Sequence, residues 1–231
     1  MNTANVILGV TTSTENCGVA LMRGGEISGM EMFPGARSCV EELVPRIERL
    51  LDSNGMKPAD IDLFGLDAGP GGLTGLKIGI ITVKTLAQCL GRGIVAVSSM
   101  RTLCGGAPRE YTHFLPAVKC MKKEFFAAVY SRREGGLECV KEECLLDLEG
   151  FRRLAESAPE GALVLGDAVE QARAAAGGAA EKLVFAGSEY NFPSAGVICG
   201  LAARGQPVQY RDVAPNYLCL SNAERNFGIT V

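Results

Sequence analysis

The sequence predicts a two-lobed α/β fold in which the second half of the chain repeats the order of the first. Three short strand-like segments open each half, and helical and strand-like segments alternate after them. Gly105, Gly106 and Pro108 cluster between the halves, as is typical of a connection between units. We therefore expect an N-terminal lobe over residues 1–105 and a C-terminal lobe over residues 106–231.

The first half opens with three strands joined by tight turns. Strands are predicted over 5–11, 18–23 and 26–33, because each segment is short and largely apolar. Gly24 and Gly25 separate the last two strands, and a pair of glycines favours a hairpin turn because both residues tolerate positive φ.

A helix is predicted over 38–54. Its apolar residues recur at helical spacing and form one continuous stripe. The stripe includes Val40, Leu43, Val44, Ile47 and Leu51. Such a stripe most often packs on the helix's own sheet. The remaining face carries charges of both signs, however, and these also suit the polar rim of a protein–protein contact.

A βαβ unit completes the first half. The strand 61–67 leads into the glycine-rich loop 69–75, the helix 76–90 and the strand 94–97, which together predict a parallel strand pair. The helix is apolar around most of its circumference, so we expect it to be buried on more than one side.

The second half repeats this order with different residues. The predicted strands are 114–118, 125–131, 137–140, 162–165 and 183–185, and the predicted helices are 148–157, 169–176 and 194–204. This duplicated order is that of the actin, Hsp70 and sugar-kinase (ASKHA) superfamily. The tail over 206–231 has little periodicity, and we expect it to pack as an extended segment.

Composition limits the kinds of function. Of the 231 residues, 47% are hydrophobic and 21% are charged, as in an ordinary globular protein, and the net charge is −3. A slightly acidic chain is a poor autonomous binder of nucleic acid, because such binding depends on Lys and Arg that neutralise phosphates. With no signal peptide and no apolar run of about 20 residues, we expect a cytoplasmic protein without membrane contact.

Neither a zinc site nor a catalytic triad matches the usual sequence patterns. The chain has nine cysteines, no CxxC pair and a single histidine, His113, which we expect in a loop or at a strand edge. The cysteines are predicted to be small buried side chains in a reducing compartment. The pairs Glu142-Glu143 and Lys122-Lys123 are predicted to be solvated. We therefore predict no catalytic and no metal-binding residues.

The glycine-rich loop suits either close packing or anion binding. Glycines let backbone N–H groups approach an anion, and the N-terminus of the following helix favours negative charge. The loop is not a Walker motif, because Lys77 does not directly follow Gly75 and Pro70 has no N–H. Close packing is the more common explanation, and both stay open. The residues concerned are Gly69, Gly71, Gly72, Thr74, Gly75 and Lys77.

Three segments of the chain resemble the TsaB (YeaZ) family. Residues 7–15 with 19–21 are similar to the family opening ILxIDTST…VAL, residues 69–79 (GPGGLTGLKIG) to its signature GPGSFTGLRIG, and residues 97–103 to GVSSLEAL. The similarity weakens after this first half. The resemblance implies the ASKHA fold and a non-catalytic subunit that serves the biosynthesis of threonylcarbamoyladenosine in tRNA.

The resemblance also implies partners. It implies pairing with the catalytic TsaD through helices of the first lobe, with the ATPase TsaE in the complex. We expect a homodimer when TsaD is absent, no tight direct tRNA binding, no cofactor for the isolated chain, and ATP only at the level of the complex. The expected contact residues are Val40, Leu43, Val44, Ile47, Leu51, Ile78 and Ile81. Leu43→Asp or Ile47→Asp should then abolish association and leave the monomer folded.

Several residues depart from the family pattern. Thr11 stands where the family opening has Asp, and a hydroxyl is a poorer Mg²⁺ ligand than a carboxylate, which argues against phosphoryl transfer. Lys119 and Met121 fall in the segment that is similar to the family's DARxGE, and they replace its usual residues. In the tail, Cys219 replaces the Arg of the family's PxYLR.

Two enzymatic alternatives stay open. A small ASKHA-fold ATPase or kinase would bind nucleotide between the lobes, at Thr11, the loop 69–75 and the turn near Gly166. An M22-type glycopeptidase, the family's older label, would need metal ligands. The segment 98–106, where TsaD carries a pair of metal-binding histidines, contains none.

Overall fold

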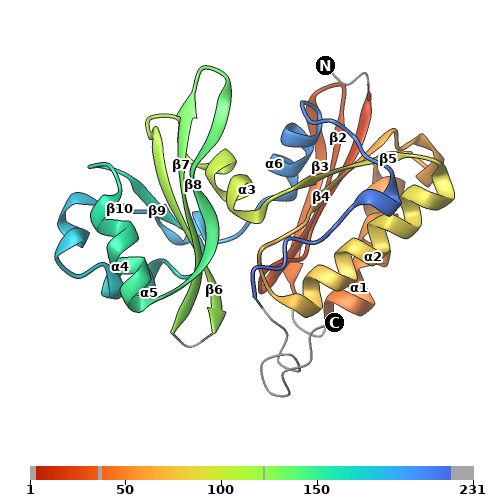
Figure 1. Ribbon diagram of the computed structural model, residues 1–231. Coiled ribbons are helices and arrows are strands. Elements are labelled where there is room, and N and C mark those ends of the chain that lie inside the picture. Colours follow the sequence, from red (N-terminus) through yellow and green to blue (C-terminus); the bar gives the residue numbers. More distant parts are fainter. Residues whose placement is uncertain (1–3, 36–37, 122, 220–231) are drawn as a thin grey trace.

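The computed structural model describes residues 4–35, 38–121 and 123–219, which form two lobes side by side (Figure 1). Each lobe is built on a five-stranded sheet. In order across the first sheet the strands are β3 (Glu26–Pro34), β2 (Asn16–Arg23), β1 (Val6–Thr11), β4 (Leu63–Asp67) and β5 (Gly93–Val97). In order across the second they are β10 (Val184–Phe185), β9 (Leu163–Leu165), β6 (His113–Met121), β7 (Glu124–Arg133) and β8 (Gly136–Asp147).

Both sheets have the same connectivity. In the first, β1, β2 and β3 pair antiparallel, whereas β4 lies parallel to β1 and β5 parallel to β4. In the second, β6, β7 and β8 pair antiparallel, whereas β9 lies parallel to β6 and β10 parallel to β9. The duplicated fold of the ASKHA superfamily, predicted from the order of the segments, is therefore confirmed.

Helices cover the sheets and connect the strands. The α-helices of the described chain are α1 (Ser38–Ser53), α2 (Leu73–Leu90), α3 (Ser99–Gly106), α4 (Leu148–Ser157), α5 (Val169–Ala176) and α6 (Ala195–Ala202). The short 3₁₀-helices are η1 (Pro58–Asp60), η2 (Gly177–Lys182), η3 (Ser188–Tyr190) and η4 (Tyr210–Asp212). α2 ends at Gly91, which adopts the left-handed conformation that glycine allows at a helix C-terminus.

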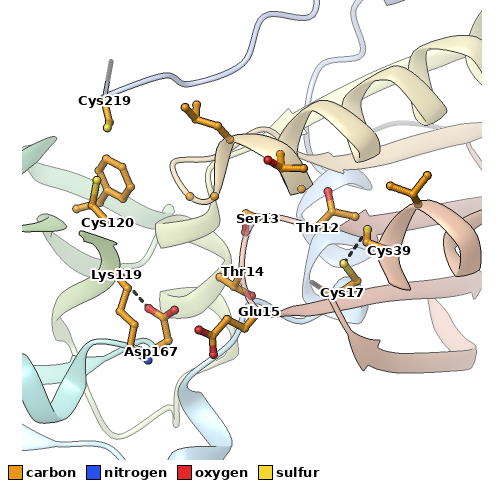
Figure 2. Close-up of a pocket in the computed structure, with 18 of the residues that line it drawn as sticks. Thr12, Ser13, Thr14, Glu15, Cys17, Cys39, Lys119, Cys120, Asp167 and Cys219 are labelled. Atoms are coloured by element: carbon orange, nitrogen blue, oxygen red, sulfur yellow. Dashed lines mark hydrogen bonds between the residues drawn. The ribbon is translucent and has the colours of Figure 1, made fainter. Parts of the chain in front are cut away.

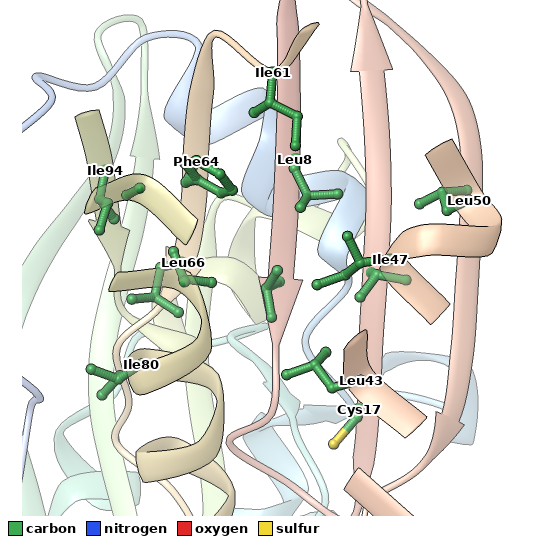
Figure 3. Packing of buried hydrophobic residues seen from close by; sticks show 14 of the residues in the cluster. Leu8, Cys17, Leu43, Ile47, Leu50, Ile61, Phe64, Leu66, Ile80 and Ile94 are labelled. Atoms are coloured by element: carbon green, nitrogen blue, oxygen red, sulfur yellow. The ribbon is translucent and has the colours of Figure 1, made fainter. Parts of the chain in front are cut away.

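The main core of the first lobe lies between its sheet and the helices α1 and α2. Leu8 from β1 and Phe64 and Leu66 from β4 meet side chains from both helices there (Figure 3). By length and composition alone α2 could cross a membrane, but the core helices of soluble proteins pass the same test, so this is weak evidence for a membrane span. Here α2 packs against α1 and β4.

Three of the expected partner contacts belong to this core, which corrects the prediction. Leu43, Ile47 and Leu51 are only 1%, 5% and 1% exposed, and they point from α1 onto the sheet (Figure 3 labels the first two). Burying each such side chain contributes roughly 1.5–3 kcal/mol to folding. An Asp at Leu43 or Ile47 would place a charge in the core, so these changes would unfold the lobe instead of testing an interface.

The two lobes exchange helices. All of α3 except its last residue lies within the first of the expected ranges, 1–105, yet Met100, Leu103 and Cys104 pack with the second lobe's Phe114 and Phe126. Conversely, α6 lies within 106–231 but covers the face of the first sheet opposite α1 and α2. The division at residue 105 therefore does not separate the two hydrophobic cores.

The described part of the tail packs as an extended segment, as expected, apart from the short 3₁₀-helix η4 within it. Val208 bridges to Ile94 at the edge of the first sheet, with backbone hydrogen bonds of 3.0 and 2.9 Å. Lys84 of α2 then donates to the Val213 carbonyl at 3.0 Å. Residues 220–231 lie outside the described part of the chain.

Candidate functional site

A cleft of about 960 Å³ lies between the lobes (Figure 2). The turn between β1 and β2 and the glycine-rich loop form one wall, and residues in the last part of β6 and just after β9 form the other. The lining residues are Thr12, Ser13, Thr14, Glu15, Cys17, Gly35, Cys39, Val40, Glu41, Gly71, Gly72, Leu73, Thr74, Gly75, Lys119, Cys120, Phe126, Asp167 and Cys219.

The glycine-rich loop packs directly on the turn between β1 and β2. A Cβ at Gly71 would lie 2.2 Å from the Ser13 carbonyl oxygen, and one at Gly75 would lie 2.0 Å from the Thr12 carbonyl oxygen. The Gly72 N–H donates to the Ser13 carbonyl at 2.7 Å. Close backbone packing therefore accounts for these glycines, and it uses one N–H that an anion would otherwise need.

Asp67, at the end of β4, joins this turn to the loop. Its Oδ2 accepts hydrogen bonds from Thr11 Oγ1 at 2.7 Å and Ser13 Oγ at 2.5 Å, and its Oδ1 accepts one from the Gly69 N–H at 3.0 Å. Burial raises the pKa of the fully buried carboxyl to about 6, although all three hydrogen bonds act to lower it. Asp67 is not among the site residues predicted from the sequence.

Thr11, which replaces the family's Asp, lies beside another carboxyl group, that of Asp67. Thr11 stands where the family opening has Asp, and its hydroxyl donates to the carboxylate of Asp67 on the neighbouring strand. A carboxylate is therefore present beside this position. It is fully buried and both of its oxygens already accept hydrogen bonds, so it is poorly placed to bind a metal in the cleft.

The opposite wall of the cleft carries Asp167 and Lys119. The Lys119 N–H donates to Asp167 Oδ1 at 2.8 Å, and burial raises the pKa of this carboxyl (Figure 2). The preceding Gly166 has φ +113°, and a Cβ there would lie 2.2 Å from the Ala117 carbonyl oxygen. The residue after Gly166 and the glycine-rich loop thus line the same cleft, which is two of the three parts that the nucleotide-binding alternative named. Thr11, the third, is fully buried and is not among the lining residues.

The chemistry of the cleft is limited among the residues that the structure describes. Within that part of the chain, no group of three or more His, Cys, Asp or Glu side chains could hold a metal ion. His113 lies at the start of β6, where Thr112 Oγ1 contacts its Nδ1 at 3.1 Å. Lys77 is exposed on α2, and Thr74 lines the cleft.

The outer faces of α1 and α2 expose apolar side chains. Val40 and Val44 on α1 are 65% and 52% exposed, and Ile81 on α2 is 64% exposed. Ile78 is partly buried against the core. The two helices cover the same face of the sheet and pack against each other (Figure 1). We call Val40, Val44 and Ile81 the α1–α2 surface; its binding to a partner stays a prediction.

Glu143 connects several segments at the junction of the lobes and is not the solvated residue that we predicted. Its Oε1 accepts hydrogen bonds from Ser98 Oγ, at the start of α3, and from Tyr130 OH at 2.6 Å. Its Oε2 accepts one from Asn216 Nδ2 of the tail at 2.6 Å. The neighbouring Glu142 is exposed, as predicted.

Comparison with known proteins gives consistent matches. The family model described as "TsaD: tRNA N6-adenosine threonylcarbamoyltransferase" matches residues 35–216. The "tRNA threonylcarbamoyladenosine biosynthesis protein TsaB" of Escherichia coli (strain K12) is 32% identical over 134 residues, which are 57% of this chain and 57% of the relative. The protein of the same name from Bacillus subtilis (strain 168) is 29% identical over 58% of each chain. The alignments thus span a little over half the length of these relatives.

A solved structure extends the match over nearly the whole chain. The structure titled "YeaZ from Pseudomonas aeruginosa" superposes with a TM-score of 0.79 at 26% identity. The match covers 93% of this chain and 100% of that one. The shared fold therefore spans both lobes.

Proposed function

Because the chain belongs to the TsaB/YeaZ family and matches the wider tRNA N6-adenosine threonylcarbamoyltransferase family, we propose that it is the non-catalytic subunit that binds and activates a TsaD-type enzyme. Its curated relatives are named for threonylcarbamoyladenosine biosynthesis in tRNA. The proposed setting is the cytoplasm. TsaE is a further component of the proposed complex, and TsaD, not this slightly acidic chain, holds the tRNA.

The α1–α2 surface is the observation that carries this proposal. Val40, Val44 and Ile81 are large apolar side chains left exposed on two helices that pack together. Charged residues border them on α1, where Arg46 forms ion pairs with Glu42, one turn earlier on the helix, and with Glu31 on β3. An apolar centre with a charged rim is the usual composition of a protein–protein contact. When TsaD is absent, we expect the same surface to pair with a second copy of the chain.

The test is a charge placed on this surface, with a matched valine elsewhere as the control. Val44 is 52% exposed on α1, and Val140 is 50% exposed on β8 of the other lobe. Val44→Asp should weaken TsaD binding by about tenfold or more, because about 1.4 kcal/mol corresponds to a factor of ten. Co-purification with TsaD and titration of the purified pair measure the effect. Equal binding by Val44→Asp and Val140→Asp would refute the proposed surface.

A nucleotide-binding enzyme is a second candidate, because the cleft brings the loop 69–75 and Asp167 to face each other. Against it, the Asp67 carboxylate is already fully engaged, and Gly72 donates to Ser13. Calorimetry of the isolated chain with ATP and Mg²⁺ separates the two candidates. Micromolar binding would favour the enzyme, whereas binding only in the presence of TsaD would place ATP at the level of the complex.

A further inference from the structure

Two cysteines lie in contact at the edge of the cleft. Cys17, near the start of β2, and Cys39, in the first turn of α1, have their sulfur atoms 2.9 Å apart (Figure 2). A disulfide bond is about 2.05 Å long, so the sulfurs need to approach by less than an ångström to be joined. The two residues are 22 positions apart in the sequence, and strand β3 lies between them along the chain.

We propose that Cys17 and Cys39 form a reversible disulfide when the protein meets a peroxide, and that this bond fastens the first turn of α1 to β2. Val40, a member of the α1–α2 surface, directly follows Cys39. A bond at Cys39 therefore also holds the neighbouring Val40 in place. That this matters for TsaD binding rests on the proposed function. Formation of the bond does not, and it can be measured on the isolated chain.

The surroundings assign different roles to the two thiols. The Cys17 thiol donates its hydrogen to Cys39, and this hydrogen bond lowers the pKa of Cys39. The same contact, together with burial, raises the pKa of Cys17. Cys39 also lies at the N-terminus of α1, where the helix dipole favours a thiolate. Cys39 is therefore the nucleophile, and Cys17 is the thiol that resolves the first product.

The reaction balances with hydrogen peroxide as the oxidant. The Cys39 thiolate attacks one peroxide oxygen and the O–O bond breaks. The leaving hydroxide takes up the proton that the Cys39 thiol had released, so the products are a sulfenic acid and one water. The Cys17 sulfur then attacks the sulfenic sulfur, the S–S bond forms and the S–O bond breaks, and the sulfenic hydroxyl leaves with the Cys17 thiol proton as a second water. Two thiols thus give up two electrons and reduce one peroxide to two waters. A cellular thiol such as glutathione reverses the bond by exchange.

Access to the pair is through the cleft. Both residues are buried, yet both belong to the cleft lining, and hydrogen peroxide is a small molecule. Cys199 offers a contrast, because its sulfur contacts the carbonyl oxygens of Ile7 and Ala20 and burial raises its pKa to about 12. Disulfides that form in a reducing compartment are usually transient and redox-sensing, which fits a pair that is reduced until an oxidant arrives.

The test is peptide mapping of the folded protein after treatment with hydrogen peroxide and alkylation. Trypsin separates residues 1–23 from residues 38–46, and each peptide contains one cysteine, Cys17 or Cys39. We expect a linked pair of these peptides, lighter by two hydrogens than their sum and lost after reduction. Cys17→Ser and Cys39→Ser should each abolish it, whereas Cys199→Ser should keep it. Circular dichroism checks that all three variants are folded.

A second measurement tests whether the bond fastens the helix. Closing a loop of this length removes freedom from the unfolded chain, so oxidation should raise Tm by about 5–10 °C in the wild type. Cys17→Ser should show no such rise. If no linked peptide forms, if Cys39 reacts with peroxide without linking to Cys17, or if the linked protein has an unchanged Tm, the proposal is overturned.

Discussion

Asp67 is the residue whose chemistry depends most on the fold. Thr11, Ser13 and Gly69 supply its three hydrogen bonds from two different segments, so the carboxylate fixes the turn after β1 against the glycine-rich loop. Burial nevertheless dominates and raises its pKa from 3.8 to about 6. The folded protein therefore holds this proton at pH values where the unfolded chain has already lost it.

The raised pKa predicts a particular pH dependence of stability. The contribution of protonated Asp67 is fully present below about pH 4 and is lost as the pH rises through about 6, by about 3 kcal/mol in total. Asp67→Asn has no such group, so its free energy of unfolding should fall less than that of the wild type between pH 4 and 7. Urea unfolding across this range measures the difference. Asp52→Asn, at an exposed position of α1, is the control and should follow the wild-type profile.

At the scale of single elements, α1 shows what a periodic pattern can and cannot predict. The spacing of its apolar residues correctly predicted a helix with one apolar stripe. It could not say what covers the stripe, and Leu43 and Ile47 turned out to face their own sheet while Val44 stays exposed. Periodicity measures the direction of a side chain around the helix axis, whereas the neighbour on that side depends on the tertiary structure.

α2 owes its position to glycines on the face that meets the turn after β1. Gly75 lies where a Cβ would be 2.0 Å from the Thr12 carbonyl oxygen, and at Gly79 it would be 2.2 Å from Thr12 Oγ1. A backbone oxygen cannot move aside as a flexible side chain can. The helix therefore approaches the strand end more closely than any residue with a Cβ would allow.

Alanine at a helical glycine should consequently have opposite effects at two sites. Gly75→Ala should destabilise the protein by about 2 kcal/mol or more, because the new methyl group forces α2 away from Thr12. At Gly200 of α6 a Cβ would meet nothing within 4 Å, so Gly200→Ala should stabilise by about 0.5–1 kcal/mol through helix propensity. Urea midpoints measure both. A Gly75→Ala protein as stable as the wild type would contradict the packing argument.

At the scale of the whole molecule, the sequence predicted the repeated order of strands and helices but not the contacts between the two halves. Local patterns identify each helix and strand. Because the connections between parallel strands are right-handed, few arrangements of these elements then remain. The roles of Asp67 and Glu143 depend on residues more than 50 positions away, such as Thr11 for Asp67 and Asn216 for Glu143. No local pattern carries that information. The glycines themselves indicated the loop 69–75, and the nucleotide-binding alternative expected it to share a cleft with the turn near Gly166. The structure adds that Asp167, directly after Gly166, lines that cleft.

Substitution of Glu143 tests which hydrogen bonds attach the tail at the junction between the lobes. It accepts hydrogen bonds from Ser98, Tyr130 and Asn216, and the Asn216 N–H also donates to the Ala68 carbonyl of the first lobe at 2.8 Å. Hydrogen bonds to a charged group are worth about 1.5–3 kcal/mol each. Removal of this carboxylate should therefore free the tail without unfolding either core.

We expect Glu143→Ala to speed amide hydrogen exchange over residues 213–219 by about tenfold or more, because local opening there loses the bond to Asn216. Glu142→Ala is the matched control, since Glu142 is the exposed neighbour on the same strand and should leave exchange unchanged. Peptide-resolved exchange followed by mass spectrometry measures both variants. Equal exchange in the two would mean that the contact between the tail and Ala68, together with the bond from Lys84 to Val213, is enough to hold the segment.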